Sequence, residues 1–188
     1  MYETIKKTYF ESIFDTTALE ENLQMIAYSL VSFFVTFLIG HPQLAVGIAV
    51  NAALILGATY LKGHKLLPII LLPSLGVLAR GLIFGPFTML LIYMIPFIWL
   101  SNALFAYGFK YLMRRKLEKK NQVANVVMPI LPAAIKTAFL FTSALILVKL
   151  AVLPTIFLTT MGILQLVTAL AGGTIAVGII KAKEAVLK

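Results

Sequence analysis

Long apolar runs alternate with short polar turns along almost the whole chain. Each run is about as long as the roughly 20 apolar residues that a helix needs to cross about 30 Å of hydrocarbon. The turns between them hold most of the proline, glycine and charge, which predicts helix ends and antiparallel neighbours. The pattern therefore predicts an all-α integral membrane protein, a bundle of six transmembrane helices. The expected spans are residues 23–40, 44–61, 66–83, 87–112, 126–149 and 154–180.

Composition supports a membrane protein. Of the 188 residues, 61% are hydrophobic and 12% are charged, against roughly 25% charged in a soluble domain. The net charge of +9 would suit nucleic acid, but no soluble module is predicted that would gather the basic residues on one face. The chain has no cysteine, which excludes disulfides and thiolate metal sites. We expect a multi-pass protein of the cell membrane, with no cofactor and no nucleic-acid partner.

The basic residues predict the orientation, because cytoplasmic loops are enriched in lysine and arginine. With six spans and a cytoplasmic N-terminus, thirteen of the 16 lysines and arginines fall on the cytoplasmic side and both termini are cytoplasmic. These are Lys6, Lys7, Lys62, Lys65, Lys110, Arg114, Arg115, Lys116, Lys119, Lys120, Lys181, Lys183 and Lys188.

The first twenty residues are predicted to be a separate segment. Ile5, Tyr9, Ile13 and Thr16 recur at helical spacing, which favours a helix lying in the membrane interface. The alternative is a partly ordered tail. We thus divide the chain into an interfacial segment, residues 1–20, and a six-helix transmembrane domain, residues 21–188.

The second expected span carries a stripe of small residues, Ala45, Ala49, Ala53 and Gly57. Small residues allow helices to approach closely in lipid. The stripe either packs inside the chain's own bundle or docks a helix of a partner protein.

Arg80 stands at the far end of the third span, where a charge beside hydrocarbon is costly. No aspartate or glutamate lies in any expected span, so its partners must be carbonyls, water, lipid headgroups or a bound anion. Arg80 either extends to the headgroups or contacts a ligand. In the second case Trp99, Asn102 and Gln165 would supply walls of an outer cavity. The amides Asn51, Asn102 and Gln165 otherwise only hydrogen-bond neighbouring helices.

Lys136 depends on where the fifth helix begins. If Pro129 and Pro132 delay the start to about residue 133, Lys136 reaches the surface. If the helix begins near residue 126, Lys136 lies close to mid-membrane and is a candidate for substrate binding.

Catalysis finds little support in the sequence. The only two histidines, His41 and His64, are expected at opposite ends of the bundle, so they cannot share a metal. The chain lacks the G-x-x-x-x-G-K-[ST] phosphate loop and has no acid in its spans for proton transfer. We expect a protein that is not an enzyme and does not use ATP unaided.

The segment VNAALILGATYLKGHKLLPIILLPSLGVLARG, followed by PFIWLSNALFAYG, resembles the substrate-binding S component of energy-coupling factor (ECF) vitamin transporters. The six-helix architecture and basic inner loops are also similar. The resemblance implies a subunit that binds a vitamin or related small molecule from outside. It also implies docking on a membrane T component driven by two ATPase subunits. The sequence departs from the family at an Ala-x-x-x-Ala surface of the first helix, where Ala27 is followed by Val31.

A second hypothesis is a non-transporting membrane scaffold or lipid-binding protein of a larger complex. This alternative predicts a solid core with no outer cavity. The presence or absence of a cavity between the helices therefore separates the two hypotheses.

The predicted orientation can be checked by placing single cysteines in the cysteine-free chain. In intact cells, an impermeant thiol reagent should label Pro42→Cys, whereas Glu118→Cys should react only after the membrane is opened, because basic loops remain inside. Labelling of residue 118 with protection of residue 42 would reverse the topology.

Overall fold

The computed structural model describes residues 2–39, 42–84, 86–119 and 124–186, and within these ranges it is built of helices without a strand. An all-α fold is therefore confirmed. The elements in chain order are α1 (Tyr2–Phe10), α2 (Ala18–Phe34), the π-helical turn η1 (Val35–Ile39), α3 (Gln43–Tyr60), the 3-10 turn η2 (Gly63–Leu66), α4 (Leu67–Phe84), the 3-10 segment η3 (Pro86–Tyr93), α5 (Ile95–Lys119), α6 (Ala124–Lys149), α7 (Ile156–Met161) and α8 (Ile163–Val186). His41 lies outside the described residues.

Five helical segments of the described chain are long and apolar enough to cross a membrane, as expected for a multi-pass membrane protein. They are Ala18–Ile39, Gln43–Tyr60, Gly63–Leu82, Met128–Lys149 and Ile156–Ala185. The fourth expected span, residues 87–112, is instead divided into η3 and α5, and α5 continues to Lys119. A sixth membrane crossing and the positions of the termini remain predictions.

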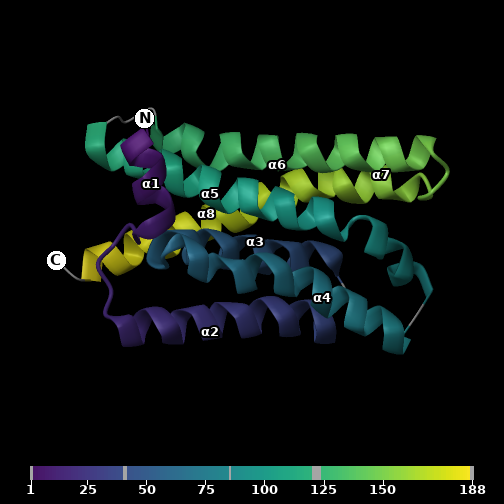
Figure 1. The fold of residues 1–188 in the computed structure, drawn as a ribbon, viewed down its shortest axis with the longest axis horizontal. Coiled ribbons are helices and arrows are strands. Elements are labelled where there is room, and N and C mark those ends of the chain that lie inside the picture. The colour runs from purple at the N-terminus through teal and green to yellow at the C-terminus, as the bar shows by residue number, and fades with distance from the viewer. Residues whose placement is uncertain (1, 40–41, 85, 120–123, 187–188) are drawn as a thin grey trace.

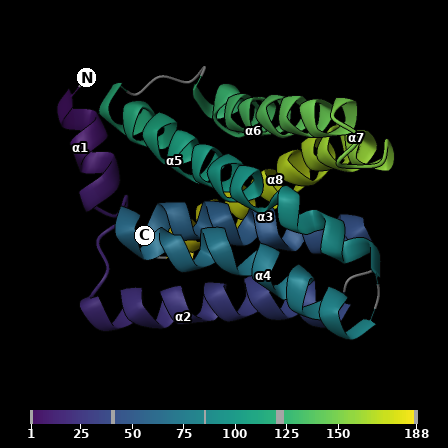
Figure 2. The ribbon, with the colours of Figure 1, turned by 45° about the vertical axis from the view of Figure 1, so that its right-hand side comes forward.

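The long helices run along one axis, and α1 stands across them near one end (Figure 1). Turning the molecule shows α2 and α6 on opposite sides, with α3 between them (Figure 2). Helix α3 packs against α2, α4, α5 and α8. Of its membrane-length window 61% is buried, against 39% or less in the other four segments. Helix α3 is therefore the central helix of the bundle.

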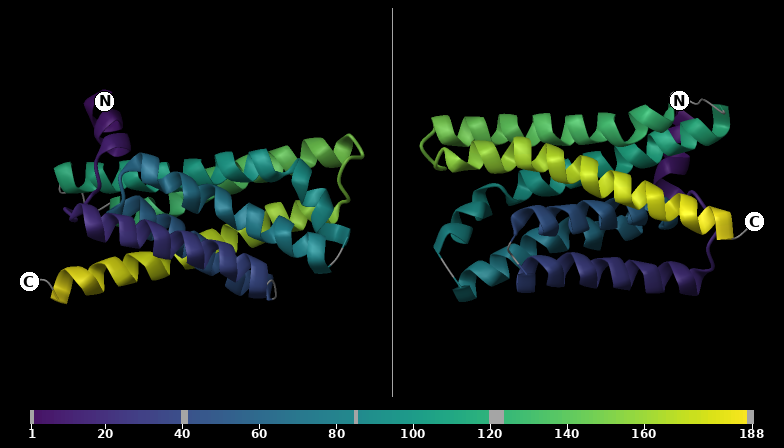
Figure 3. Two further views of the ribbon diagram at one scale, coloured as in Figure 1. Left: turned by 60° about the horizontal axis from the view of Figure 1, so that its bottom comes forward. Right: turned by 180° about the vertical axis from the view of Figure 1, so that it is seen from behind.

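Helix α8 crosses the bundle obliquely, as seen from behind in Figure 3, and makes close contact with α3. The contact depends on Gly172, because a Cβ atom there would lie 2.6 Å from the carbonyl oxygen of Ile48 and 2.9 Å from the backbone nitrogen of Ala52. Such close backbone approach is typical of helix pairs in membranes, where small residues replace the hydrophobic drive for association.

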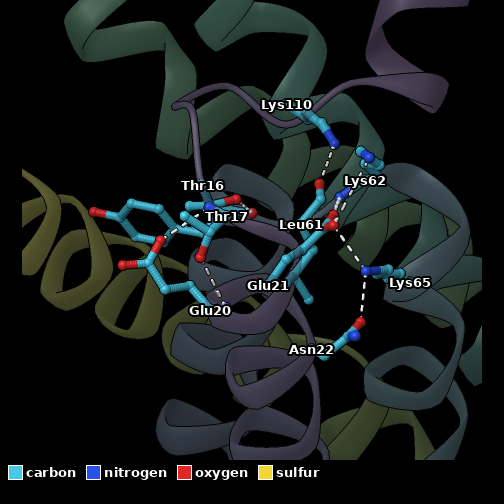
Figure 4. A network of polar contacts seen from close by, with 10 residues as sticks. Thr16, Thr17, Glu20, Glu21, Asn22, Leu61, Lys62, Lys65 and Lys110 are labelled. Carbon is cyan, nitrogen blue, oxygen red and sulfur yellow. Dashed lines mark hydrogen bonds and ion pairs between the residues drawn. The ribbon is translucent and has the colours of Figure 1, made fainter.

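A buried carboxylate fixes the turn between α3 and α4. Glu21 Oε1 accepts a hydrogen bond of 2.6 Å from the Lys62 backbone, and its Oε2 lies 2.7 Å from Lys65 Nζ (Figure 4). Lys110 Nζ donates to the Leu61 carbonyl at 2.6 Å in the same turn. The expectation that no acid lies within a span is wrong, because the segment Ala18–Ile39 contains Glu20 and Glu21 and the segment Ile156–Ala185 contains Glu184. Helix α2 begins at Ala18, capped by the Thr17 side chain, rather than at residue 23.

The N-terminal segment packs on the same end of the bundle, but only Tyr2–Phe10 of it form the helix α1. Ile13 and Thr16 lie beyond the end of that helix, and residues 18–20 belong to α2. The Tyr9 ring stacks on that of Tyr107, with 6.1 Å between the centroids. Arg114 holds the segment through Glu11 Oε2 at 3.3 Å and the Ser12 carbonyl at 2.8 Å. We call the end that carries these residues and the turn Leu61–Leu66 the basic end. Its place at a membrane interface stays a prediction.

Two glycines of α8 offer a matched test of the packing against α3. Gly172→Ala should lower the free energy of unfolding by about 1–3 kcal/mol, because overpacking forces the two backbones apart. Gly178→Ala should be neutral or stabilising by up to about 1 kcal/mol, since a Cβ there has no neighbour within 4 Å. Denaturation of the purified protein in detergent measures both. Equal effects of the two substitutions would show that the close contact at Gly172 does not contribute to stability.

Candidate ligand-binding site

Lys136 lies halfway along α6, twelve residues after Ala124 and thirteen before Lys149. At about 1.5 Å per residue, each end of the helix is roughly 18–20 Å away. Pro129 and Pro132 lie inside the helix and do not delay its start. Of the two predicted starts for this helix, near residue 133 or near residue 126, the structure has the earlier one. The Lys136 side chain is only 2% exposed.

Two asparagines hold the ammonium group of Lys136. Its Nζ atom donates to Asn51 Oδ1 at 2.6 Å and to Asn102 Oδ1 at 2.9 Å. The same atom lies 5.1 Å from the centroid of the Phe105 ring, within the range of a cation–π interaction. Both amide oxygens point at the ammonium because their NH₂ groups are bound elsewhere. Asn51 Nδ2 donates to Thr168 Oγ1 at 3.2 Å, and Asn102 Nδ2 donates to the Ile70 carbonyl at 3.2 Å.

Pro73 lies inside α4, close to two backbone carbonyls that accept hydrogen bonds from side chains of α5. A proline inside a helix removes one backbone hydrogen bond and distorts the turn before it. Beside this distortion, the carbonyls of Ile70 and Leu71 accept hydrogen bonds from Asn102 Nδ2 and Trp99 Nε1, each at 3.2 Å. Side chains of α5 thus bond to the backbone of α4 close to this proline, as neighbouring helices do in membranes.

A cavity of about 160 Å³ adjoins the lysine. One part of its lining is polar, and it consists mainly of Asn51, Ser74, Asn102, Lys136, Gln165 and Thr168. The rest is largely aliphatic, from Val46, Val50, Val77, Leu91, Ile98 and Leu164. An apolar cavity of about 150 Å³ is large enough for benzene. The volume therefore suits a small ring or a compact aliphatic molecule.

Ser74 is the member of the lining whose polar atom is left unsatisfied. Its side chain is 3% exposed, and its Oγ has no hydrogen-bond partner within the described structure. An unpaired buried hydroxyl costs about 1–3 kcal/mol. A ligand group or an ordered water in the cavity would remove that cost.

The cavity extends from mid-bundle toward the end opposite the basic end. Gln43 is the first residue of α3, Leu91 lies in η3, and Leu164 is the second residue of α8, and all three line it. The π-helical turn η1 contributes Thr36. Irregular backbone at membrane depth is tolerated where it lines a cavity or is buried in protein, which matches the positions of η1 and η3.

The predicted site residues divide into two groups. Asn102, Gln165 and Lys136 line the same cavity. Arg80 and Trp99 do not belong to its lining, so the expected cluster around Arg80 does not form. Arg80 Nη1 instead donates to the Leu38 carbonyl at 3.2 Å, and Trp99 bonds to α4 as described above.

Sequence reasoning missed Ser74 and Thr168 as lining residues, because hydroxyl side chains are common in membrane helices and carry little signal. Asn51 was one of three amides that were predicted either to hydrogen-bond neighbouring helices or to line one cavity. In the structure all three amides line the cavity, and Asn51 also binds Lys136.

The stripe of small residues on α3 is partly enclosed by the chain itself. Ala53 is 4% exposed, and a Cβ on the buried Gly57 would lie 2.8 Å from Ile69 Cδ1. Ala45 is exposed and Ala49 half-buried. This arrangement fits packing within the bundle for the half of the stripe near the basic end. Docking of a partner helix stays a prediction.

Comparison with known proteins gave no match among protein-family models, curated proteins or solved structures. Among the described residues, no group of three or more histidines and acids could hold a metal ion.

A double-mutant cycle tests the link between Asn51 and Lys136. Asn51→Leu should lower the free energy of unfolding by about 1–3 kcal/mol, because it deprives a buried ammonium of an acceptor. In Asn51→Leu with Lys136→Met, much of that loss should disappear, since the charge is no longer there. Chemical denaturation in detergent would measure the coupling. Strictly additive effects would mean that the two side chains do not interact.

Proposed function

We propose that this chain is the substrate-binding subunit of a membrane uptake system, which binds a small molecule inside its helical bundle. The observation that supports the proposal best is the cavity beside Lys136, which is lined by several polar side chains and by an aliphatic wall. Ligand sites are typically concave and mostly apolar, with a few polar groups that orient the ligand.

The energetic cost of this arrangement favours a binding role over a solid scaffold. A lysine at membrane depth is expensive, and such residues usually face a bundle interior or a cavity and serve function. The cavity also leaves Ser74 Oγ without a partner. A scaffold would gain stability from aliphatic side chains at both positions, because replacing a buried charge by packed apolar residues is often neutral or stabilising.

The uptake part of the proposal rests on the sequence. The chain lacks a phosphate loop, so any ATP-driven step by that route belongs to other subunits. The resemblance to ECF S components supplies a matching arrangement, in which a membrane T component and two ATPase subunits provide the energy. The alternative function, a lipid-binding or scaffolding membrane protein, would use the exterior of the bundle instead of its cavity.

Two phenylalanine variants on α4 would test ligand binding without knowing the ligand. Val77 lines the cavity, whereas Leu75 is 38% exposed on the outside of the same helix. Purified, immobilised protein is exposed to a cell metabolite extract and washed, and the compounds released by denaturation are analysed by mass spectrometry. Wild type and Leu75→Phe should enrich one small compound about tenfold or more over Val77→Phe, because the ring fills the cavity.

Folding of both variants is verified by their thermal midpoints in detergent. If wild type enriches no compound over a folded Val77→Phe protein, the cavity does not bind a small molecule and the scaffold alternative gains support.

A further inference from the structure

We infer that the ligand of this cavity is a small monoanion, with a carboxylate or similar oxyanion on a compact apolar body, and that Lys136 and Ser74 receive its charged group. The inference rests on the proposed function and adds to it the chemical class of the substrate. It is carried by four observations on the described residues: the missing counter-charge at Lys136, the unsatisfied hydroxyl of Ser74, the number of cations in the lining, and the size of the cavity.

Lys136 has hydrogen-bond partners but no opposite charge. Its acceptors, Asn51 and Asn102, are neutral amides, so they orient the ammonium without compensating it. An ammonium has three donors, and these two bonds use two of them. Buried charges in proteins are paired or bound to counter-ions, and within the described structure Lys136 belongs to no ion pair.

The chain's own acids lie far from this lysine. All seven belong to segments at or near the basic end, either before or within the first turn of α2 or close to the C-terminal ends of α5 and α8. They are Glu3, Glu11, Asp15, Glu20, Glu21, Glu118 and Glu184. Lys136 lies roughly 18–20 Å from either end of α6. No acid of the chain is therefore placed to pair with Lys136, and an anionic group in the cavity would supply the counter-charge.

Ser74 supplies a second donor for the same anion. Its buried Oγ lines the cavity and makes no hydrogen bond, and a hydroxyl can donate to a carboxylate oxygen. Hydrogen bonds to ionised acceptors are about twice as strong as those between neutral groups. A carboxylate in the cavity that contacts both the lysine and the serine would satisfy both unmet requirements at once.

The lining also limits charge and size. Lys136 is the one lysine or arginine among the residues that line this cavity, so a single negative charge is matched and a dianion is not. The volume of about 160 Å³ accepts a body close to benzene in size. Val46, Val50, Val77 and Ile98 would surround that body with aliphatic groups.

A panel of matched acids and amides tests the inference. Each pair, such as benzoate and benzamide, has the same shape and about six to ten non-hydrogen atoms, and only the acid is charged at neutral pH. Binding to the full-length protein in detergent is measured by calorimetry and by thermal shift. At least one acid should bind about tenfold or more tightly than its amide, the factor expected for a hydrogen bond to a charged group.

Two substitutions test whether Lys136 and Ser74 cause the preference for acids over amides. Lys136→Gln should bring the acid and its amide to equal affinity, and Ser74→Ala should weaken the acid several-fold while leaving the amide nearly unchanged. Leu75→Phe, outside the cavity, should keep the preference of the wild type. If Lys136→Gln does not fold, the test rests on Ser74→Ala and on the acid-to-amide ratio of the wild type.

The outcomes separate the inference from the function on which it rests. Amides that bind as tightly as their acids, with binding lost in Val77→Phe, would overturn the anionic class and leave the binding function standing. A preference for acids that survives in a folded Lys136→Gln protein would also overturn the inference. If no member of the panel binds and the wild type enriches no compound from the metabolite extract, the proposed function fails as well.

Discussion

Burial of a single ammonium group at mid-bundle is the constraint around which the helices are arranged. Lys136 of α6 binds Asn51 of α3 and Asn102 of α5, and these asparagines continue to Thr168 of α8 and to the Ile70 carbonyl of α4. One connected set of hydrogen bonds thus spans five helices. Because a buried polar group without a partner is costly, each member restricts the rotation and depth of its helix. Apolar helix faces alone could pack in several ways, and the network favours one arrangement of the helices.

The two ends of the bundle differ in how charges are paired and in how regular the helices are. At the basic end, the buried carboxylate of Glu21 receives hydrogen bonds from the Lys62 backbone and the Lys65 ammonium, so Lys65 has a counter-charge within the protein. At the opposite end the chain departs from regular α-helix in η1 and η3, and residues of both line the cavity. Lys65 is therefore paired with a carboxylate of the chain, whereas Lys136 at mid-depth is bound only by neutral amides. This asymmetry is what points to a ligand at Lys136.

Close packing of small residues and the polar network have separate roles. Gly172 brings the backbones of α3 and α8 together, and Gly76 does the same for α4 and α2, where a Cβ would collide with Thr36 Oγ1 and the Phe33 carbonyl. These contacts hold the helices without a hydrophobic drive in lipid. Uptake, ECF-like docking and the orientation in the membrane remain proposals that depend on partners and on the bilayer.

The sequence by itself determined the class of the protein, since the length and spacing of apolar runs leave only helices that can satisfy their own backbone in lipid. It also marked Lys136, Asn102 and Gln165, because polar residues in apolar runs are rare. It did not determine that Glu21 enters α2 or that α5 begins at Ile95, because turn and cap geometry sets such boundaries. Only the tertiary structure placed Asn51 beside Lys136 and Ser74 in the lining of the same cavity, and directed Arg80 and Trp99 to backbone carbonyls. A helical pattern gives the spacing of residues along one axis, whereas the rotation of each helix about that axis is decided by its neighbours.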